Sequence, residues 1–334
     1  GKYYQMSKYL EEEALTEYEP KALDDEVLRG VVEQLDDPYA RYFTAEEYQD
    51  YIKIYDSSFV GIGVRYTEED GKIIVKGIIS GGPAEEAGIR EGDQLLKADG
   101  KELTDSLTTQ EILLGEAGTT VKLTVLRNEQ VLTFELVRAK IETESTYNEV
   151  IDKKNKIGYL YISIFAEDTA KDVKLAIKDL KNQGCEKVVI DLRSNGGGLT
   201  NEAYEVADYL LPAGIIDTEK DKAGKEIVHK SKAGDAGVKY VVLVDGYTAS
   251  ASEIVAAAIQ DNKGGKIIGT KTFGKGVTQI MRSFRDGSAV KYTVTEYFRP
   301  NGKKVNKVGV TPDIIEEDND RMMEIALDEL KKMK

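Results

Sequence analysis

Cysteine and histidine are almost absent from this chain of 334 residues, which contains one of each. The lone cysteine, Cys185, cannot form an internal disulfide, and because it precedes a predicted strand at 187–191 we expect it to be a small buried residue. The lone histidine, His229, restricts the chemistry, since any Ser-His-Asp triad or multi-histidine metal site would need it. It lies in the polar segment 225–232, where a surface position is predicted, so catalytic groups are sought elsewhere.

Long apolar runs and an excess of positive charge are missing as well. No stretch of about 18 apolar residues occurs, so no membrane span is predicted, and there is no charged-then-apolar signal segment. The formal charge of −14 argues against nucleic acid as a partner, because a phosphate backbone favours clustered lysine and arginine. The chain begins with Gly1 rather than Met, so we expect a fragment or processed product whose native N-terminal signal or anchor is missing.

A helical pattern rich in Tyr, Glu and Leu occupies residues 1–57. Apolar residues recur at helical spacing between 23 and 35, and the cap-like sequence 44–47 opens a further helix at 46–55. Apolar positions on more than one face suit a docking or dimerisation arm, which makes a homodimer one expectation. The alternative is a helical lid on its own domain.

Short strands with turn signals replace this pattern from residue 58 to residue 140. The expected elements are strands at 61–66, 73–75, 78–79 and 92–100, a helix at 84–87, a helix around 106–114, and strands at 121–127 and 130–137. This order, with Gly61-Ile62-Gly63-Val64, Gly82-Pro83-Ala84 and Gly92-Asp93, resembles a PDZ domain.

The resemblance implies a groove for protein C-terminal tails. Backbone N–H groups of Gly61, Ile62, Gly63 and Val64 are expected to bind a terminal carboxylate, while the following strand pairs with an extended peptide. The alternative is a β-domain without a ligand.

Alternating strands and helices from residue 156 onward indicate an α/β domain. The elements expected are strands at 157–162 and 188–192, helices at 168–183 and 199–211, strand-like runs at 289–294 and 296–298, and a C-terminal helix at 320–332. Gly196, Gly197 and Gly198 precede the second helix, but no Lys-Ser or Lys-Thr follows and the dinucleotide spacing is absent, which disfavours a nucleotide site. A glycine turn at a helix start more plausibly offers bare N–H groups to an oxyanion.

Residues 241–254 place a serine where a strand ends and a helix begins. Four branched apolar residues, 241–244, predict a buried strand, an Asp-Gly pair ends it, and helical spacing follows. Negative charge developing beside Ser250 would be stabilised by the free N–H groups and the dipole of that helix. The alternative is that Thr248, Ser250 or Ser252 simply caps the helix.

With His229 discounted, the general base is sought among the lysines. A lysine can serve when burial and apolar neighbours lower its pKa, so that the neutral amine is available. Lys275 has apolar or small neighbours on both sides, and Gln279 is placed to orient its amine. Lys271 is the competitor, but its neighbours carry hydroxyls, so less complete desolvation is expected there.

Four motifs together resemble those of the carboxyl-terminal processing peptidases, also called tail-specific proteases. They are Thr-Ala-Ser-Ala-Ser-Glu-Ile at 248–254, Phe-Gly-Lys-Gly-x-x-Gln at 273–279, Asp-Leu-Arg-x-Asn-Gly-Gly-Gly at 191–198, and Pro-Asn-Gly with Gly-Val-Thr-Pro-Asp between 300 and 313. Asp37-Pro38-Tyr39 and the PDZ-like segment occur in the family's order, so the resemblance covers essentially the whole chain.

The resemblance assigns the chemistry residue by residue. Ser250 would be the nucleophile, Lys275 its general base and Gln279 the orienter of Lys275, and the peptide bond would be hydrolysed through an acyl-enzyme. Backbone N–H groups of Ala251 and of Gly196 or Gly197 would form the oxyanion hole. No metal or other cofactor is implied.

The implied architecture is a crotonase-like α/β catalytic core with an inserted PDZ domain and helical N- and C-terminal segments. The domain boundaries expected are 1–57, 58–140 and 141–334. The family further implies substrates with accessible C-terminal tails and a place outside the cytoplasm.

One position departs from the family pattern. Many members carry an arginine where this chain has Leu114, so a coupling of the PDZ domain to the active site through that arginine is not expected here. Two other functions compete with the peptidase: a non-catalytic PDZ scaffold, and an acyl-CoA enzyme of crotonase type, which would need neither Ser250 nor Lys275.

Overall fold

The computed structural model describes residues 2–16, 19–56, 58–69, 71–79, 81–104, 109, 112–142, 145–232, 234 and 236–333. The chain divides into two compact units. The smaller is Asp56–Ser145, and the larger combines Gly1–Tyr55 with Thr146–Lys334. Ser250 and Lys275 both lie in the larger unit.

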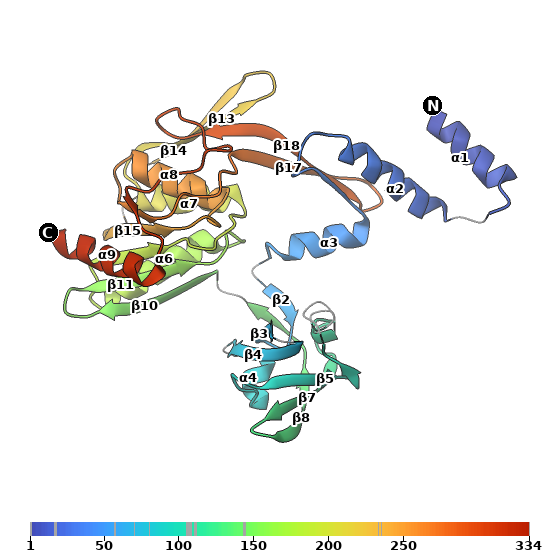
Figure 1. Cartoon of the computed structure of the whole chain (residues 1–334), viewed down its shortest axis with the longest axis horizontal. Coiled ribbons are helices and arrows are strands. Elements are labelled where there is room, and N and C mark those ends of the chain that lie inside the picture. The colour runs from blue at the N-terminus through green and yellow to red at the C-terminus, as the bar shows by residue number, and fades with distance from the viewer. Residues whose placement is uncertain are drawn as a thin grey trace. The chain divides into compact units, whose positions relative to one another are not determined.

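A mostly parallel sheet is the centre of the larger unit (Figure 1). Its strands are, in spatial order, β10 (Thr146–Asp152), β11 (Ile157–Ile162), β12 (Lys187–Asp191), β15 (Lys239–Val244), β16 (Ile267–Gly269) and β19 (Ile314–Ile315). Neighbours are parallel except β10 and β11, which pair antiparallel. β12 and β15 are buried along nearly their whole length, which explains their continuous apolar runs.

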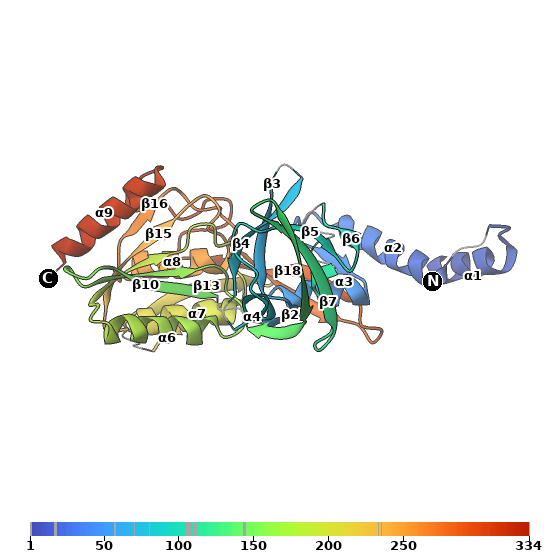
Figure 2. The same cartoon turned by 90° about the horizontal axis from the view of Figure 1, so that it is seen from below.

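Helices cover both faces of this sheet, and α9 and α6 lie on opposite sides of it (Figure 2). The helices are α6 (Thr169–Asn182), α7 (Thr200–Leu210), α8 (Ala251–Asp261) and α9 (Asn319–Lys332). Side chains alternate along β15, so Val242 and Val244 join the core with α6, α7 and α8, whereas Val241 and Leu243 pack with α9. The α/β core predicted from the sequence is confirmed.

A second sheet packs against α7 and α8. Its strands are, in order, β1 (Arg41–Phe43), β18 (Ala289–Phe298), β13 (Gly214–Asp221) and β14 (Glu226–Ser231), with β17 (Val277–Ser283) also paired to β18. The prediction of two runs at 289–294 and 296–298 was wrong, because β18 is continuous and pairs with β17, β13 and β1 along its length.

His229 lies in β14 opposite Asp217, not in a surface loop. Its ring stacks on Tyr204 of α7 with the centroids 4.0 Å apart, and 29% of its side chain is exposed. The side chain is therefore half-buried rather than fully at the surface, because strand alternation turns it toward α7. Cys185, by contrast, is buried as predicted.

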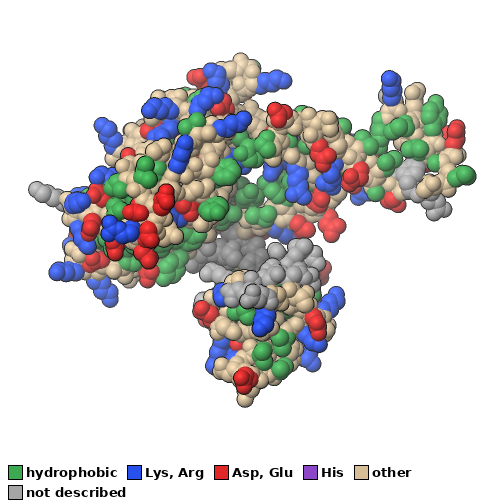
Figure 3. Space-filling model, viewed as in Figure 1, with side chains coloured by type: hydrophobic (Ala, Val, Ile, Leu, Met, Phe, Trp, Pro, Cys, Tyr) green, Lys and Arg blue, Asp and Glu red, His purple; other side chains and the backbone are tan. Residues whose placement is uncertain are grey.

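The N-terminal helices are α1 (Lys2–Glu13), α2 (Pro20–Glu33) and α3 (Ala45–Lys53). α3 begins at a capping box in which Thr44 and Glu47 each bind the other's backbone N–H. Apolar side chains lie on the surface over α1 and α2 (Figure 3), among them Tyr4, Met6, Tyr9, Val31 and Leu35. None of the described helices combines the length and the apolar character that crossing a bilayer requires.

The smaller unit is an antiparallel β-structure. Its elements are β2 (Ser58–Gly61), β3 (Val64–Glu69), β4 (Lys72–Ile78), α4 (Pro83–Ala87), β5 (Gln94–Ala98), β6 (Lys101–Glu102), β7 (Thr120–Arg127), β8 (Gln130–Val137) and β9 (Ala139–Glu142). Its core contains Val75, Leu95, Leu123 and Leu136. The helix predicted over 106–114 lies largely outside the described residues.

Candidate active site

Two loops meet at one edge of the parallel sheet, because β12 and β15 are neighbours that run in the same direction. Thr248 Oγ1 donates to the Leu192 carbonyl at 2.8 Å. The Asn195 carbonyl accepts from the Ala249 N–H at 3.0 Å and from Ser252 Oγ at 3.1 Å. Thr248 and Ser252 are fully buried, so their hydroxyls fasten the loop after β15 to the loop after β12.

Ser250 occupies the N-cap position of α8 in a strained conformation. Its φ of 57° and ψ of −119° lie outside the regions that residues with a side chain usually adopt. Such strain amounts to about 1–3 kcal/mol and persists only where the surroundings impose it. Here the fastened loops impose it, and the Ser250 N–H donates to Glu253 Oε2 at 2.9 Å. The residue remains partly exposed at the end of α8.

The glycine loop touches Ser250 directly. Gly197 has a φ of 99°, and a Cβ placed on it would lie 2.8 Å from Ser250 Cβ and 2.9 Å from the Ala251 nitrogen. Only glycine fits between these atoms. The Gly197 N–H donates to Asn195 Oδ1 at 2.9 Å. Among the hydrogen bonds of the described residues, none uses the N–H of Gly196 or Ala251, so these two donors remain for a ligand.

Lys275 lies in the segment between β16 and β17, and its ammonium is 4.6 Å from the centre of the Tyr39 ring. Burial lowers the pKa of Lys275, and the charge of Lys291 lowers it further, while the carboxylates of Asp37 and Glu253 oppose both effects. Lys271, the competing candidate, is exposed. The desolvation that a lysine base requires is thus found at Lys275.

Ser250 Oγ and Lys275 Nζ share no hydrogen bond among those of the described side chains. Gln279 does not reach the lysine either: its amide donates to Thr293 Oγ1 at 3.1 Å and to the Val277 carbonyl at 3.4 Å. Catalytic hydrogen bonds often tighten only in the complex with substrate. The Ser250 hydroxyl and the Lys275 ammonium are therefore not directly hydrogen-bonded in this structure.

Glu253 holds those two backbones with one carboxylate. It is fully buried and accepts hydrogen bonds from the N–H groups of Ser250, Gly274 and Lys275 and from Thr272 Oγ1. Burial raises the pKa of Glu253, and the four donors counteract that rise. Sequence reasoning missed this residue, although Ser250 and Glu253 have the Ser-x-x-Glu spacing of a capping box.

Tyr297 of β18 holds the same two residues from the other side. Its buried hydroxyl lies 3.1 Å from the Ser250 carbonyl oxygen and 2.7 Å from the Lys275 carbonyl oxygen. Glu253 and Tyr297 thus fix the N–H and the C=O of both residues. No signal in the sequence indicated Tyr297, because it is 47 residues from Ser250.

The N-terminal segment completes this region through Asp37 and Tyr39. Asp37 accepts from the Thr293 N–H at 2.9 Å, from Thr293 Oγ1 at 3.1 Å and from the Tyr39 N–H at 3.0 Å. Desolvation opposes ionisation of Asp37, but these hydrogen bonds prevail and lower its pKa. The Asp37 carboxylate therefore stays charged and anchors Tyr39 over Lys275.

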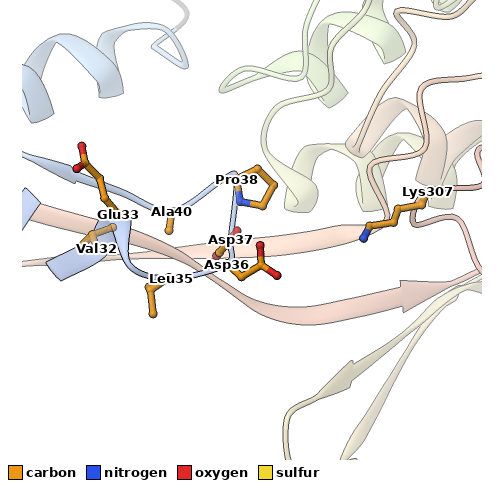
Figure 4. A pocket seen from close by; sticks show the side chains of 8 residues that line it. All are labelled: Val32, Glu33, Leu35, Asp36, Asp37, Pro38, Ala40 and Lys307. Carbon is orange, nitrogen blue, oxygen red and sulfur yellow. The ribbon is translucent and has the colours of Figure 1, made fainter. Parts of the chain in front are cut away.

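A pocket of about 510 Å³ opens next to Asp37 (Figure 4). The residues lining it are Val32, Glu33, Leu35, Asp36, Asp37, Pro38, Ala40 and Lys307. Lys307 projects from the opposite wall, and its N–H donates to the Gly274 carbonyl at 2.7 Å. The pocket thus lies between the Asp37 loop and Lys307, and Lys275 is not among the residues that line it.

The predicted carboxylate loop of the smaller unit lies between β2 and β3. Gly63 has a φ of 79°, and the carbonyls of Ile62 and Gly63 accept from Ala84 N–H and Ile79 N–H. Among the described strands, β3 is at one end of its sheet, which is the position where an extended peptide can add a strand. Gly61 and Val64 belong to the paired strands β2 and β3, so the N–H groups of Ile62 and Gly63, between these strands, are the first to test as binding groups.

Comparison with protein families identifies the class. Residues 156–316 match the model of peptidase family S41, and residues 60–137 match the PDZ domain. The chain belongs to the S41 peptidase family and carries a PDZ domain.

Individual relatives agree with this assignment. The chain is 35% identical over 312 residues to the carboxy-terminal processing protease CtpA of Bacillus subtilis strain 168. The matched region is 91% of this chain and 66% of that protein. A protein of Staphylococcus haemolyticus strain JCSC1435 named as a probable CtpA-like serine protease is 35% identical, over 87% of this chain and 59% of that protein. The chain thus spans less than two thirds of the length of these relatives.

Among solved structures, the photosystem II D1 C-terminal processing protease is similar with a TM-score of 0.57 and 28% identity. The match covers 97% of this chain and 90% of that one. The fold is therefore shared along nearly the whole chain.

Proposed function

We propose that this protein is a serine endopeptidase that cleaves polypeptides through an acyl-enzyme on Ser250. The neutral amine of Lys275 accepts the Ser250 hydroxyl proton as Oγ attacks the peptide carbonyl carbon, and the resulting ammonium gives that proton to the leaving amine. Water then hydrolyses the ester by the same proton transfers in reverse order. The N–H groups of Ala251 and Gly196 stabilise the oxyanion, because Gly197 N–H is already bonded to Asn195.

The observation that carries this proposal is the shared clamp on Ser250 and Lys275. Glu253 and Tyr297 both contact both residues, although Ser250 and Lys275 are 25 residues apart in the sequence. A purely capping serine would not require such a link to a half-buried lysine. Gln279 is proposed to orient Lys275 once substrate binds, with its present contact to Thr293 as the resting position.

The smaller unit is proposed to recruit substrates by their C-terminal tails. β3 would pair with the tail, and the loop of Gly61, Ile62, Gly63 and Val64 would bind the terminal carboxylate. By analogy with its relatives, the protein acts outside the cytoplasm and requires no cofactor. The apolar side chains over α1 and α2 favour a homodimer, which sedimentation would test.

Cleavage of an unstructured polypeptide tests the chemistry. We expect activity in the wild type and none in Ser250→Ala or Lys275→Ala with their folds intact by circular dichroism. Equal cleavage by all three would exclude the dyad, and no cleavage by any, with tails still bound, would favour the PDZ scaffold. Tail recognition is tested by titrating the protein with a peptide as the free acid and as the C-terminal amide, where equal affinity would remove the carboxylate role.

A further inference from the structure

Lys291 is a second half-buried lysine near the proposed base. Its ammonium donates to Tyr51 Oη at 3.1 Å and lies 4.6 Å from the centre of the Tyr51 ring and 5.9 Å from that of Phe43. Within the described part of the chain no carboxylate forms an ion pair with it. A half-buried ammonium held by rings and a hydroxyl keeps its field, because no adjacent anion cancels it.

The strand β18 places this ammonium on the side of the Asp37 loop. Lys291 and Thr293 lie on one face of β18, roughly 7 Å apart, because side chains alternate along a strand. A bulge in β18 beyond Thr293 turns Tyr297 to the opposite face. Thr293 binds the carboxylate of Asp37, which also accepts the N–H of Tyr39, and the Tyr39 ring lies over Lys275. The face that carries Lys291 therefore contacts the loop that covers Lys275.

Asp37 lies between the two lysines and cannot neutralise both. Three hydrogen bonds from Thr293 and Tyr39 already occupy its oxygens. It nonetheless favours the charged form of each lysine, and the charge of Lys291 opposes this effect at Lys275. The protonation of Lys275 thus depends on the balance between these two charges.

We propose that Lys291 is a positioning residue of the hydrolytic site, whose ammonium disfavours a second positive charge nearby and so keeps Lys275 as the neutral amine that accepts the Ser250 proton. This inference rests on the proposed role of Lys275 as general base. A nearby cationic group is one of the known physical routes to an amine that is unprotonated near neutral pH.

The other charges around both lysines set the sign of the effect. Lys275 faces Asp37, Tyr39 and Glu253, of which the two carboxylates favour its ammonium form. Around Lys291 the charged and titratable groups are Arg41 from β1, Tyr51 from α3, Tyr55 from the turn after α3, and Asp37. Removing the charge of Lys291 leaves the carboxylates unopposed, so the pKa of Lys275 rises and less neutral amine is present at pH 7.

The test is the pH dependence of kcat/KM in Lys291→Met, which keeps the length of the apolar stem. We expect the acid limb of the profile to move to higher pH by roughly 0.5–1 unit, with a loss of about three- to tenfold on the acid side and convergence with the wild type at alkaline pH. Lys291→Arg keeps the charge and should keep the limb in place. Lys178→Met, on the exposed face of α6, removes the same charge from the whole protein and serves as the control.

Two outcomes would overturn the inference: an acid limb in Lys291→Met that coincides with the wild-type limb, or one in Lys291→Arg that shifts as far as in Lys291→Met.

If Lys291→Met does not fold, Lys291→Gln replaces it. A direct measurement is the NMR titration of Lys275 in Ser250→Ala protein labelled at lysine Cε, with and without the Lys291 substitution. Cleavage by Lys275→Ala separates the two hypotheses, because activity there refutes the proposed base itself, whereas an unmoved limb with inactive Lys275→Ala refutes only the role of Lys291.

Discussion

The two halves of the site are built in different ways. On the serine side, the loops after β12 and β15 meet because the two strands are parallel neighbours, and short hydrogen bonds from Thr248 and Ser252 fasten them. On the lysine side, Asp37 binds Thr293 across 256 residues, and Tyr39 covers Lys275. The serine is thus placed by sheet topology, whereas the environment of the lysine is assembled from remote segments.

This difference predicts that activity is lost when a substitution changes the shape of the loops around Ser250. Around Lys275, activity should instead change when a substitution alters the charge of a neighbouring side chain. Glu253 and Tyr297 join the two halves, so substitutions there should affect both.

The largest effect is expected from Gly197→Ala. The new Cβ would lie 2.7 Å from the Ala249 carbonyl oxygen and 2.8 Å from Ser250 Cβ, so the loops must separate. We expect kcat/KM for polypeptide cleavage to fall by about 100- to 1,000-fold, since the oxyanion donors are displaced. Gly184→Ala is the matched control, because its φ of 91° is similar but its Cβ would meet no atom within 4 Å. A Gly197→Ala enzyme with near wild-type activity would contradict the contact between loop and serine.

Glu253→Ala should lower activity by about 100-fold and also destabilise the fold, because four buried donors lose their acceptor. Glu253→Gln keeps one acceptor oxygen and should lie between the alanine variant and the wild type. Activity and urea unfolding are measured together. The surface substitution Glu324→Ala, whose partner Arg321 is exposed, should change stability by less than about 1 kcal/mol. Equal stability of Glu253→Ala and the wild type would contradict the proposal that Glu253 holds the Ser250 and Lys275 segments together.

Activity of the wild type should rise with pH along the acid limb, because the base must be neutral and the pKa of Lys275 is lowered by burial and by Lys291. The limb should therefore lie below the usual range of a lysine side chain. Measuring kcat/KM from mildly acidic to alkaline pH checks this. A flat profile over that range would argue that the lysine side contributes no titrating base.

Tyr297→Phe removes one hydroxyl from the clamp and keeps the ring. We expect a loss of about 1 kcal/mol in stability and up to roughly tenfold in activity, since Glu253 still holds both residues. Tyr147→Phe on the exposed part of β10 is the control. An unchanged kcat/KM in Tyr297→Phe would assign the positioning of both backbones to Glu253 alone.

The smallest effect on activity is expected from Asp217→Asn in β13. Burial, with help from Glu219 and against the hydrogen bond from Tyr204, raises the pKa of Asp217 to about 7. The folded state therefore binds a proton more tightly than the unfolded chain, so wild-type stability should fall as pH rises from about 4 to 7. In Asp217→Asn this contribution, up to about 1.4 kcal/mol per pH unit, is absent. Identical pH dependence of unfolding in both proteins would exclude a protonated Asp217.

Much of the site was readable from local pattern. Ser250 follows a buried apolar strand and opens a helix, Lys275 lies among glycines, and Gly197 belongs to a glycine run at a helix start. Each of these features involves residues that are close in sequence, so hydrophobic periodicity and turn residues are enough to predict it. The roles of these residues in catalysis, the domain boundaries and the crotonase-like arrangement stay predictions.

Other features could not be read in this way. Nothing in the sequence pairs Gln279 with Thr293 or turns His229 onto Tyr204, because such contacts depend on which strands become neighbours. The single strand β18 was divided in the prediction for the same reason: its pairing with three other strands, not its local composition, decides its length.

The sequence by itself determined the order of the elements, the α/β core, the PDZ domain and the position of a serine at the end of β15. Hydrophobic period, glycine turns and a strand-to-helix junction are local properties, so they can be predicted without knowing the fold. The tertiary structure alone decided what surrounds the lysine. Asp37 and Tyr39 approach Lys275 from the N-terminal segment, while Tyr297 and Lys291 act on it from β18, and a pKa depends on distances in space.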